Sequence, residues 1–428
     1  MTDKETLEYC LNNLKHAGVD KASCSLNLSE KKELNVEIGE MTLFRTTFNS
    51  SMGISVIKDQ KKGSTSINKT DKESIDQAIK QVLDIAIGSK PDPCYDIANK
   101  QSPQIFSKGE KTPNLDKMYQ SLEEFINYVK HTYPKIQIEQ AILDFTKSKS
   151  YYMNTNGVDF EIEDGIYGFS PFFLSKDQKN TSSFNYTGFS TLKIDKPLHK
   201  YGTIDTLLSQ STEQLNTKNL NDKFVGTIIV TPDCIGDFLG FIINDISDGK
   251  MISGNSIYKN KLNTQIANPN FTLYSNPISD EIEDGYFITN DGYVAENSTI
   301  IDKGILKTHL LGIYGSNKLD MKRAVNNGGA YIIDAGDIDH QSIIKKIDKG
   351  LLLSRFSGGY PSPNGDFSGV AKNSYYIENG EIKYPITETM ISGNIKQMFQ
   401  NIKYISKDRI NFGSSILPWI SFDGITVS

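Results

Sequence analysis

The sequence predicts an α+β fold, in which an N-terminal α/β region with a mixed or antiparallel sheet precedes a β-rich C-terminal domain. In the first half, helix patterns with capping residues alternate with strand patterns. The last third carries hairpin turns and few helix patterns. The chain has 428 residues, which is enough for two or three domains with cores of their own.

The N-terminal unit begins with a helix from Thr2 to Gly18, where Thr2 and Glu5 form a capping box. Thr70 and Glu73 predict the start of a second helix, which we expect to end at Gly88. Strand patterns lie between the two helices. Residues 89–113 contain four prolines and few apolar residues, which is typical of a linker. We therefore expect a first α+β domain over residues 1–105.

The middle unit is predicted to begin with a helix that has Thr112 as N-cap and Pro113 as its first residue. An antiparallel meander follows, because Asn156-Gly157 is a hairpin signal between two strand patterns. This second domain is expected over residues 106–215.

The third unit, residues 216–428, starts with a strand and a helix with Thr231 at its N-cap and Pro232 at its first position. An apolar stripe predicts which face of this helix is buried, and Gly249 is expected to end it. The stripe consists of Ile235, Phe238, Leu239, Ile242 and Ile246. Hairpins are expected at Lys303-Gly304 and Asn379-Gly380.

Composition narrows the range of partners. Lys and Arg total 46 against 52 Asp and Glu, for a net charge of −6. No basic stripe is present, so direct binding of nucleic acid is not expected. The N-terminus lacks the pattern of a signal peptide and no apolar run is long enough to span a bilayer, so we expect a cytoplasmic protein without a membrane partner.

The sequence contains none of the usual spacings of metal-binding residues. Cys10, Cys24, Cys94 and Cys234 form no CxxC pair, and none of the five histidines lies four residues from another His or from a Cys. We expect the cysteines to be reduced and mostly buried. No nucleotide-binding loop, nucleophile elbow or HExxH motif occurs.

Five polar residues in turns and connections are candidates for a cleft or a partner-facing surface: Asp291, Arg323, Asn326, Asp366 and Ser368. Asp291 lies in the turn signal Asn290-Asp291-Gly292. Asp366 and Ser368 belong to a Gly-rich run over residues 357–369, which is either a tight connection between strands or a source of backbone N–H groups for a ligand.

The order and spacing of several segments resemble the TldD/PmbA (TldD/TldE) family, whose members were once described as modulators of DNA gyrase and are now regarded as peptide-processing metalloproteases. The resemblance covers nearly the whole chain. The segments that carry it are Val36–Glu40, Met52–Val56, Lys62–Ser66, Asp302–Lys307, Asn364–Ser368, Tyr376–Ile382, Ile391–Asn394 and Pro418–Gly424.

The resemblance implies two kinds of chain. TldD-type chains carry HExxxH on the helix that follows the β-rich stretch, together with a late cysteine that completes a zinc site. Here that helix contains no His and no Glu, and residues 412–418 contain no Cys. Without these ligands nothing would hold zinc or activate its water. The chain thus looks like the TldE/PmbA type, which lacks the metal, so zinc is expected only in a TldD-type partner.

The resemblance therefore implies a non-catalytic, metal-free subunit of a cytoplasmic zinc metallopeptidase complex that processes or degrades unfolded or modified peptides. The partner would be a TldD-type chain or a second copy in a dimer. The alternative is a homodimeric protein of the same fold that binds an extended peptide along a sheet edge without protease activity. A third hypothesis is a metal-independent hydrolase that uses Asp291 or Asp366, but no nucleophile with an evident base accompanies either residue.

Overall fold

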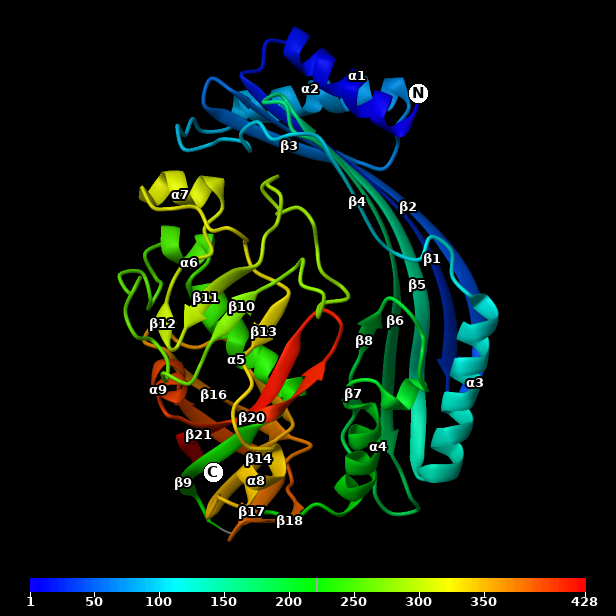
Figure 1. Cartoon of the computed structure of the whole chain (residues 1–428), viewed down its shortest axis with the longest axis vertical. Coiled ribbons are helices and arrows are strands. Elements are labelled where there is room, and N and C mark those ends of the chain that lie inside the picture. The colour runs from blue at the N-terminus through cyan, green and yellow to red at the C-terminus, as the bar shows by residue number, and fades with distance from the viewer. Residues whose placement is uncertain (221) are drawn as a thin grey trace.

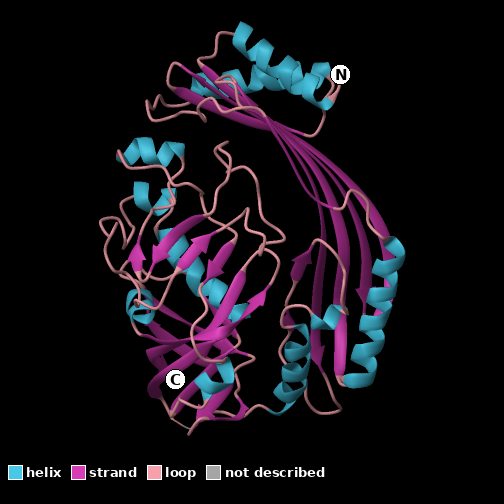
Figure 2. Ribbon diagram, in the orientation of Figure 1, coloured by secondary structure: helices cyan, strands magenta, loops and turns pink. Residues whose placement is uncertain are grey.

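The computed structural model describes residues 1–220 and 222–428, and it has the predicted α+β architecture. A long curved sheet arches over a second, β-rich unit (Figures 1 and 2). The helices are α1 (Asp3–His16), α2 (Lys72–Gly88), α3 (Leu115–Thr132), α4 (Ile204–Glu213), α5 (Pro232–Asp245), α6 (Asp248–Ile252), α7 (Ile313–Leu319), α8 (His340–Ile344) and α9 (Ile395–Gln400).

The first sheet has the strand order β3-β2-β1-β5-β6-β4, and both β7 and β8 also pair with β6. All its pairs are antiparallel except β4 with β6, so the sheet is mixed, as predicted. Its strands are β1 (Lys21–Glu37), β2 (Glu40–Lys58), β3 (Lys61–Ile67), β4 (Gln104–Gly109), β5 (Ile136–Asn154), β6 (Asp159–Ser175), β7 (Asn185–Tyr186) and β8 (Phe189–Thr191).

The curvature of this sheet follows from its strand lengths, because strand twist accumulates over 17 to 19 residues in β1, β2, β5 and β6. Helices α1 and α2 cover one end of the outer face and α3 lies against the other end (Figure 1). Gly63 allows α2 to lie directly on β3, since a Cβ there would come within 2.2 Å of the Val82 carbonyl oxygen.

The second sheet has the order β12-β11-β10-β13-β21-β9-β14-β17-β18, and β15, β16, β19 and β20 join it through β21. Strand β21 is central, because it pairs with β9, β13, β19 and β20. The strands are β9 (Phe224–Val230), β10 (Leu273–Ser275), β11 (Ser298–Asp302), β12 (Ile305–Leu306), β13 (Tyr331–Ile333), β14 (Lys349–Leu353), β15 (Arg355–Gly358), β16 (Asp366–Lys372), β17 (Tyr375–Glu378), β18 (Glu381–Pro385), β19 (Thr389–Asn394), β20 (Ile402–Asn411) and β21 (Ile416–Val427).

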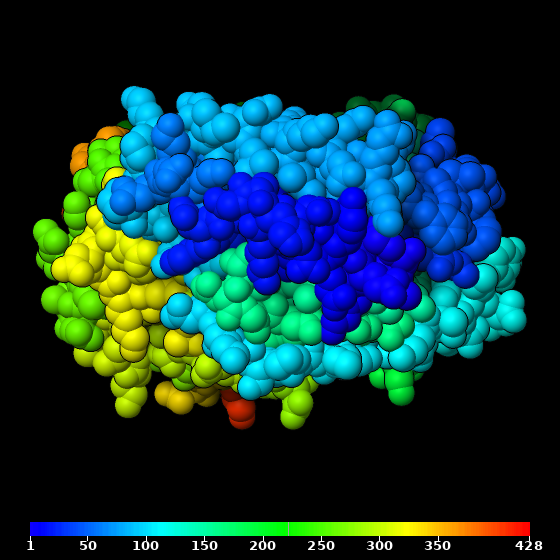
Figure 3. Space-filling view, turned by 90° about the horizontal axis from the view of Figure 1, so that it is seen from above, coloured from blue at the N-terminus to red at the C-terminus, as the bar shows by residue number. Residues whose placement is uncertain are grey.

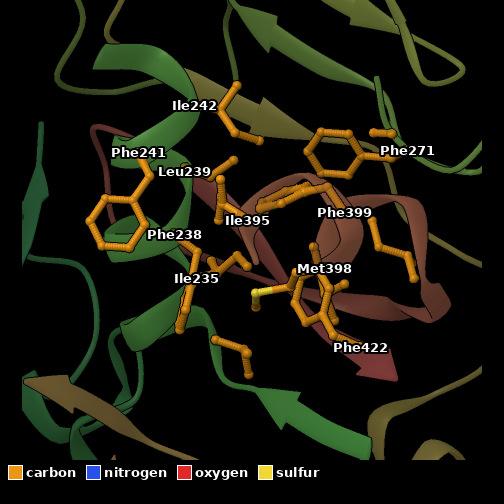
Figure 4. Packing of buried hydrophobic residues seen from close by; sticks show 14 of the residues in the cluster. Ile235, Phe238, Leu239, Phe241, Ile242, Phe271, Ile395, Met398, Phe399 and Phe422 are labelled. Carbon is orange, nitrogen blue, oxygen red and sulfur yellow. The ribbon is translucent and has the colours of Figure 1, made fainter. Parts of the chain in front are cut away.

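The largest core lies between this sheet, α5 and α9. The predicted stripe of α5 is buried, and Ile242 points toward the side of the core where Phe399 of α9 lies (Figure 4). The Phe238 ring packs against Phe356 and Phe367. The opposite side of α5 carries Gly236 and Gly240, which are exposed. Burying the stripe therefore turns a face of small residues outward, toward the inner face of the first sheet.

Several predicted boundaries are confirmed and others are wrong. The capping box of Thr2 and Glu5 and the turns at 156–157, 303–304 and 379–380 are present. The N-cap of α2 is Asp71 and not Thr70, because the Asp71 carboxylate accepts the Ser74 N–H. Likewise Asn114, and not Thr112, caps α3.

Two further corrections concern the expected linker and the end of α5. The segment 89–113 contains β4, which pairs in parallel with β6. Helix α5 ends at Asp245, before Gly249, because the Ser247 hydroxyl donates to the Ile243 carbonyl and a short helix, α6, follows. The three domain ranges stay a prediction; β1 and β5, from the first two ranges, pair in one sheet.

Replacing Phe399 with Ala should lower the free energy of unfolding by about 3–5 kcal/mol, because this fully buried ring contacts Phe271 and Phe422 and its loss leaves a cavity. Urea unfolding followed by circular dichroism measures the change. The matched control is Tyr360→Ala, at a ring that is 78% exposed, with an expected change below about 0.5 kcal/mol. Equal effects of the two variants would contradict this description of the core.

Candidate functional site

A cleft of about 520 Å³ lies between the inner face of the first sheet and α5. We call it the α5 cleft. Strands β5 and β6, the segment from β7 to β8, the first turns of α5, β15 and the turn before β21 all contribute to it. Its lining residues are Asp144, Gly168, Phe169, Ser170, Tyr186, Thr187, Gly188, Phe189, Ser190, Pro232, Asp233, Gly236, Arg355, Phe412, Ser414, Ser415 and Leu417.

Helix α5 leaves this cleft open. A Cβ at Gly236 or Gly240 would meet no atom within 4 Å. The cleft thus has space beside the helix that longer side chains would occupy.

Arg355 supplies the positive charge of the cleft. Its guanidinium carbon lies 3.1 Å from the centre of the Tyr186 ring, and its Nη1 donates to Asn185 Oδ1 at 3.5 Å. The guanidinium is therefore held flat against the ring, while most of its five N–H donors form no hydrogen bond to described residues. Such a group can bind a carbonyl oxygen or a carboxylate.

Two aspartates of α5 lie close to Arg355. The Asp233 carboxylate accepts hydrogen bonds from the hydroxyls of Thr187 and Thr203 at 2.8 and 2.7 Å. Burial raises the pKa of both Asp233 and Asp237, and the charge of Arg355 opposes that rise. The hydroxyl pair thus fixes Asp233 as an acceptor beside the guanidinium.

The residues of this region do not fit a zinc ion. Over residues 240–245, Gly240 has no side chain, Phe241 packs against Phe238 and Phe356, and Asp245 accepts the backbone N–H of Ile257. The turn before β21 offers Ser414 and Ser415, whose hydroxyls are poor zinc ligands compared with imidazole or thiolate. Within the described residues, no group of three or more His, Cys, Asp or Glu side chains is arranged to hold a metal.

A second cleft, of about 600 Å³, lies between strands β1, β2, β3 and β5 and the segment containing α6 and α7. We call it the α7 cleft. Asp291 lines it and is the centre of its polar network. The Arg323 guanidinium binds Asp291 through Nε and Nη2 at 2.8 and 2.5 Å, and the Thr289 hydroxyl and the Ile313 backbone N–H also donate to this carboxylate.

This network sets the charge state of Asp291. Burial acts to raise the pKa of the Asp291 carboxyl, but the hydrogen bonds from Arg323 and Thr289 outweigh it and hold the pKa below its usual value. Arg323 in turn stacks on Tyr293, with its Cζ 4.0 Å from the ring centre. The Ile313 N–H thus joins the 289–293 turn to the start of α7, and Arg323 joins the same turn to the segment after that helix.

The other predicted site residues lie elsewhere. Asn326 is 1% exposed, and its side chain bonds backbone groups of Ser275 and Glu296, so it joins loops in the interior. Asp366 and Ser368 are exposed on β16, and Asp366 accepts hydrogen bonds from Asn364 and Asn394 at a separate pocket. Of the five residues, the structure thus brings only Asp291 and Arg323 into direct contact.

Sequence reasoning missed Arg355, Tyr186 and Asp233. They lie far apart in the chain, and no local pattern links them. The rarity of arginine could have drawn attention to Arg355, because only four arginines occur among 428 residues. The cysteine expectation is mostly confirmed: Cys10, Cys24 and Cys234 are buried and free, whereas Cys94 is half-buried.

Comparison with known proteins gives two family matches. Residues 225–428 match the PmbA/TldA metallopeptidase C-terminal domain, and residues 24–86 match the PmbA/TldA metallopeptidase domain 1. The metalloprotease PmbA of Escherichia coli O157:H7 is 25% identical over 95% of this chain and 92% of that protein. A PmbA homolog of Buchnera aphidicola subsp. Acyrthosiphon pisum is 27% identical, with 96% of each protein covered.

Solved structures share the fold. TldE from Thermococcus kodakarensis superposes with a TM-score of 0.84 at 17% identity, covering 99% of this chain and 100% of that one. A Bacteroides thetaiotaomicron protein described as a modulator of DNA gyrase superposes with a TM-score of 0.89 at 20% identity, covering 100% and 98%. Both alignments extend over essentially the whole length of the chain.

Replacing Asp291 with Asn should lower the free energy of unfolding at pH 7 by roughly 1.5–3 kcal/mol, because Arg323 loses a charged, hydrogen-bonded partner in a mostly buried position. A carboxyl whose pKa is lower in the folded state stabilises the fold above its unfolded pKa, about 3.9. The difference between the two proteins should therefore shrink as the pH falls below about 4.

Urea unfolding between pH 7 and pH 3 measures this difference. Asp84→Asn is the control, because Asp84 is exposed on α2. A deficit of the Asp291 variant that stays constant down to pH 3 would contradict the assigned pairing.

Proposed function

Because the chain belongs to the PmbA/TldD metallopeptidase family, we propose that it is the metal-free subunit of a cytoplasmic zinc metallopeptidase complex that processes unfolded or modified peptides. A TldD-type chain would supply the zinc. In this proposal the present chain contributes binding and positioning of the peptide.

The α5 cleft is the observation that most directly supports this proposal. The two segments that hold the zinc ligands in TldD-type chains correspond here to α5 and the turn before β21, and the region where they meet remains an open cleft of about 520 Å³. The side chains that would hold and use the metal are missing, but the space beside Gly236 and Gly240 is not filled by other residues. This open space can therefore accept a bound peptide segment even though the site holds no metal.

The lining of the cleft suits a peptide. Arg355 presents N–H donors for a main-chain carbonyl or a terminal carboxylate, and Asp233 and the serines of the late turn present acceptors and hydroxyls. Tyr186 and Phe412 add aromatic surface. These groups bind and orient, and none of them is a nucleophile paired with a base.

One structural finding bears on the expected absence of a membrane partner. Among the described residues, no helix combines the length and the apolar character that a bilayer crossing requires. The cytoplasmic location stays part of the proposal.

We expect the purified chain to be inactive alone and to support cleavage of an unstructured peptide only when mixed with a TldD-type chain. The assay compares each chain alone with the mixture, with and without a chelator. Elemental analysis of the same samples should find zinc bound to the partner and less than stoichiometric zinc on this chain, because Gly240, Phe241 and Asp245 offer no imidazole.

Two outcomes would overturn the proposal. Chelator-resistant cleavage by this chain alone would favour the carboxylate hydrolase. An inactive mixture, together with binding of peptide by this chain alone, would favour the homodimeric peptide-binding protein.

In the active mixture, Arg355→Ala should raise KM for the peptide roughly tenfold, the equivalent of about 1.4 kcal/mol, because a guanidinium in the cleft is lost. Arg355→Lys keeps the charge but loses the planar stack on Tyr186, so it should restore only part of the affinity. Steady-state kinetics measures KM and kcat separately. If both variants match the wild-type chain, the α5 cleft does not bind the substrate.

A further inference from the structure

The α7 cleft contains a carboxylate whose charge no cation offsets. Asp248 accepts the backbone N–H of Gly312 at 3.0 Å, and no Lys, Arg or His among the described residues forms an ion pair with it. Burial raises the pKa of the Asp248 carboxyl, and the negative charge of Asp291 adds to that rise. Asp248 therefore differs from Asp291, whose charge the Arg323 guanidinium already offsets.

Three polar side chains converge on the space above Gly312. A Cβ added at this glycine would lie 3.4 Å from Asp248 Oδ2, 3.5 Å from Asp291 Oδ2 and 3.5 Å from Asn327 Nδ2. The backbone of Gly312 is extended, with φ −77° and ψ −173°, so its conformation does not require a glycine. The missing side chain thus leaves room for a small group in contact with all three polar side chains.

Asn327 adds an acceptor that has no donor. Its Oδ1 is buried and has no hydrogen-bond partner among the described residues. A buried acceptor without a donor is unfavourable. The Nδ2 atom lies on the side of Gly312, and a half-turn of the amide about its terminal torsion, which is roughly two-fold, brings Oδ1 to that side. A bound donor would therefore satisfy Asn327 and offset the charge of Asp248 together.

Hydroxyl groups line the sheet side of the cleft. The residues that alternate with Ser23 and Ser25 on β1 are buried beneath α1, so these two serines lie on the inner face. Ser23 stands opposite Ser55 of β2, and Ser55 stands opposite Ser64 of β3. The hydroxyls thus form a row across three strands. They can bond to peptide N–H and C=O groups, and they are uncharged.

Helix α7 is joined directly to the first unit beside this cleft. The Tyr314 ring stacks on the Tyr95 ring with 4.9 Å between their centres, and Lys318 Nζ lies 2.6 Å from the Asp92 carboxylate. In Figure 3 the yellow surface of α7 adjoins the light blue surface of that unit. The cleft volume of about 600 Å³ lies within the range of about 300–1,000 Å³ that is usual for small-molecule sites.

We propose that the α7 cleft binds a primary ammonium group, that of a peptide amino terminus or of a lysine side chain, at Asp248 and Asn327. The chain that bears the ammonium lies along the row of hydroxyls. This inference does not rest on the proposed function, because the α7 cleft and the α5 cleft share no lining residue.

An ammonium group suits the site better than a metal ion does. It has three N–H donors and needs one negative charge, which Asp248 provides. Ca²⁺ and Mg²⁺ need about six or more oxygen ligands, whereas both oxygens of Asp291 already accept hydrogen bonds. Lys62 also lines the cleft, but it is exposed on β3 and forms no ion pair with Asp248, so the charge of Asp248 is left for a ligand.

Titration calorimetry of the full chain with alanine tetrapeptides tests the site. All proteins carry Arg355→Ala, which weakens any binding in the α5 cleft. The tetrapeptide with a free amino terminus should bind, and its N-acetylated form should bind at least tenfold more weakly. An N-acetylated tetrapeptide with one lysine distinguishes the two sources: binding equal to that of the free peptide shows that the site accepts a lysine side chain, and weak binding shows that it selects amino termini.

Two variants locate the binding. Asp248→Asn removes the charge but keeps an acceptor for the Gly312 N–H. Gly312→Ala keeps both carboxylates, and its Cβ fills the space between them at ordinary van der Waals distances, so the fold should tolerate it. Each variant should weaken binding of the free peptide at least tenfold, whereas Asp84→Asn, exposed on α2, should not change it. Circular dichroism verifies that each protein is folded, and Gly312→Ala decides if Asp248→Asn is not.

Three results overturn the proposal. One is the absence of binding of the free peptide at millimolar concentration. Another is binding that acetylation does not weaken, or that the folded variants at residues 248 and 312 do not weaken. The third is binding of Ca²⁺ that depends on Asp248 while the peptide does not compete with the ion.

Discussion

Burial of one face of α5 is the constraint on which the rest of the C-terminal unit depends. Ile235, Phe238 and Ile242 fill the largest core together with α9 and β21. Once this stripe is inside, the opposite face with Gly236 and Gly240 must look toward the first sheet. The position of the α5 cleft is thus a consequence of helix amphipathicity, and it does not depend on whether that face carries metal ligands.

The long sheet meets a different requirement, because no helix of the described residues covers the middle of its outer face (Figure 1). Ion pairs occupy this region: Lys147 with Glu163 and Lys149 with Glu161 join β5 to β6, and Lys32 pairs with Glu30 within β1. Opposite charges on facing strands stabilise a solvated sheet modestly and keep apolar surface off it. The β2 segment with Leu43, Phe44 and Phe48 is an exception to this pattern, because these apolar side chains are exposed.

Local signals in the sequence predicted most elements, and non-local contacts account for the misses. The turn at Asn156-Gly157 and the stripe of α5 follow from neighbouring residues alone. Strand β4 was hidden in a proline-rich segment because its pairing with β6, about 55 residues later, gives it strand geometry. For the same reason the pairing of Asp291 with Arg323 and the stacking of Arg355 on Tyr186 could not be read from spacing, since each joins segments that only the finished fold brings together.

The central place of β21 in the second sheet has a consequence for biosynthesis. Strand β9 needs β21 as a neighbour, yet nearly 190 residues separate the end of one from the start of the other. While the ribosome is still producing the intervening segments, β9 has an unsatisfied edge and α5 has no α9 to cover it. The first sheet can close much earlier, because its strands all lie before residue 192. The nascent chain therefore carries a folded first sheet beside an incomplete C-terminal unit that still exposes apolar surface and unpaired strand edges. In this state chaperone binding or misassociation would compete with folding.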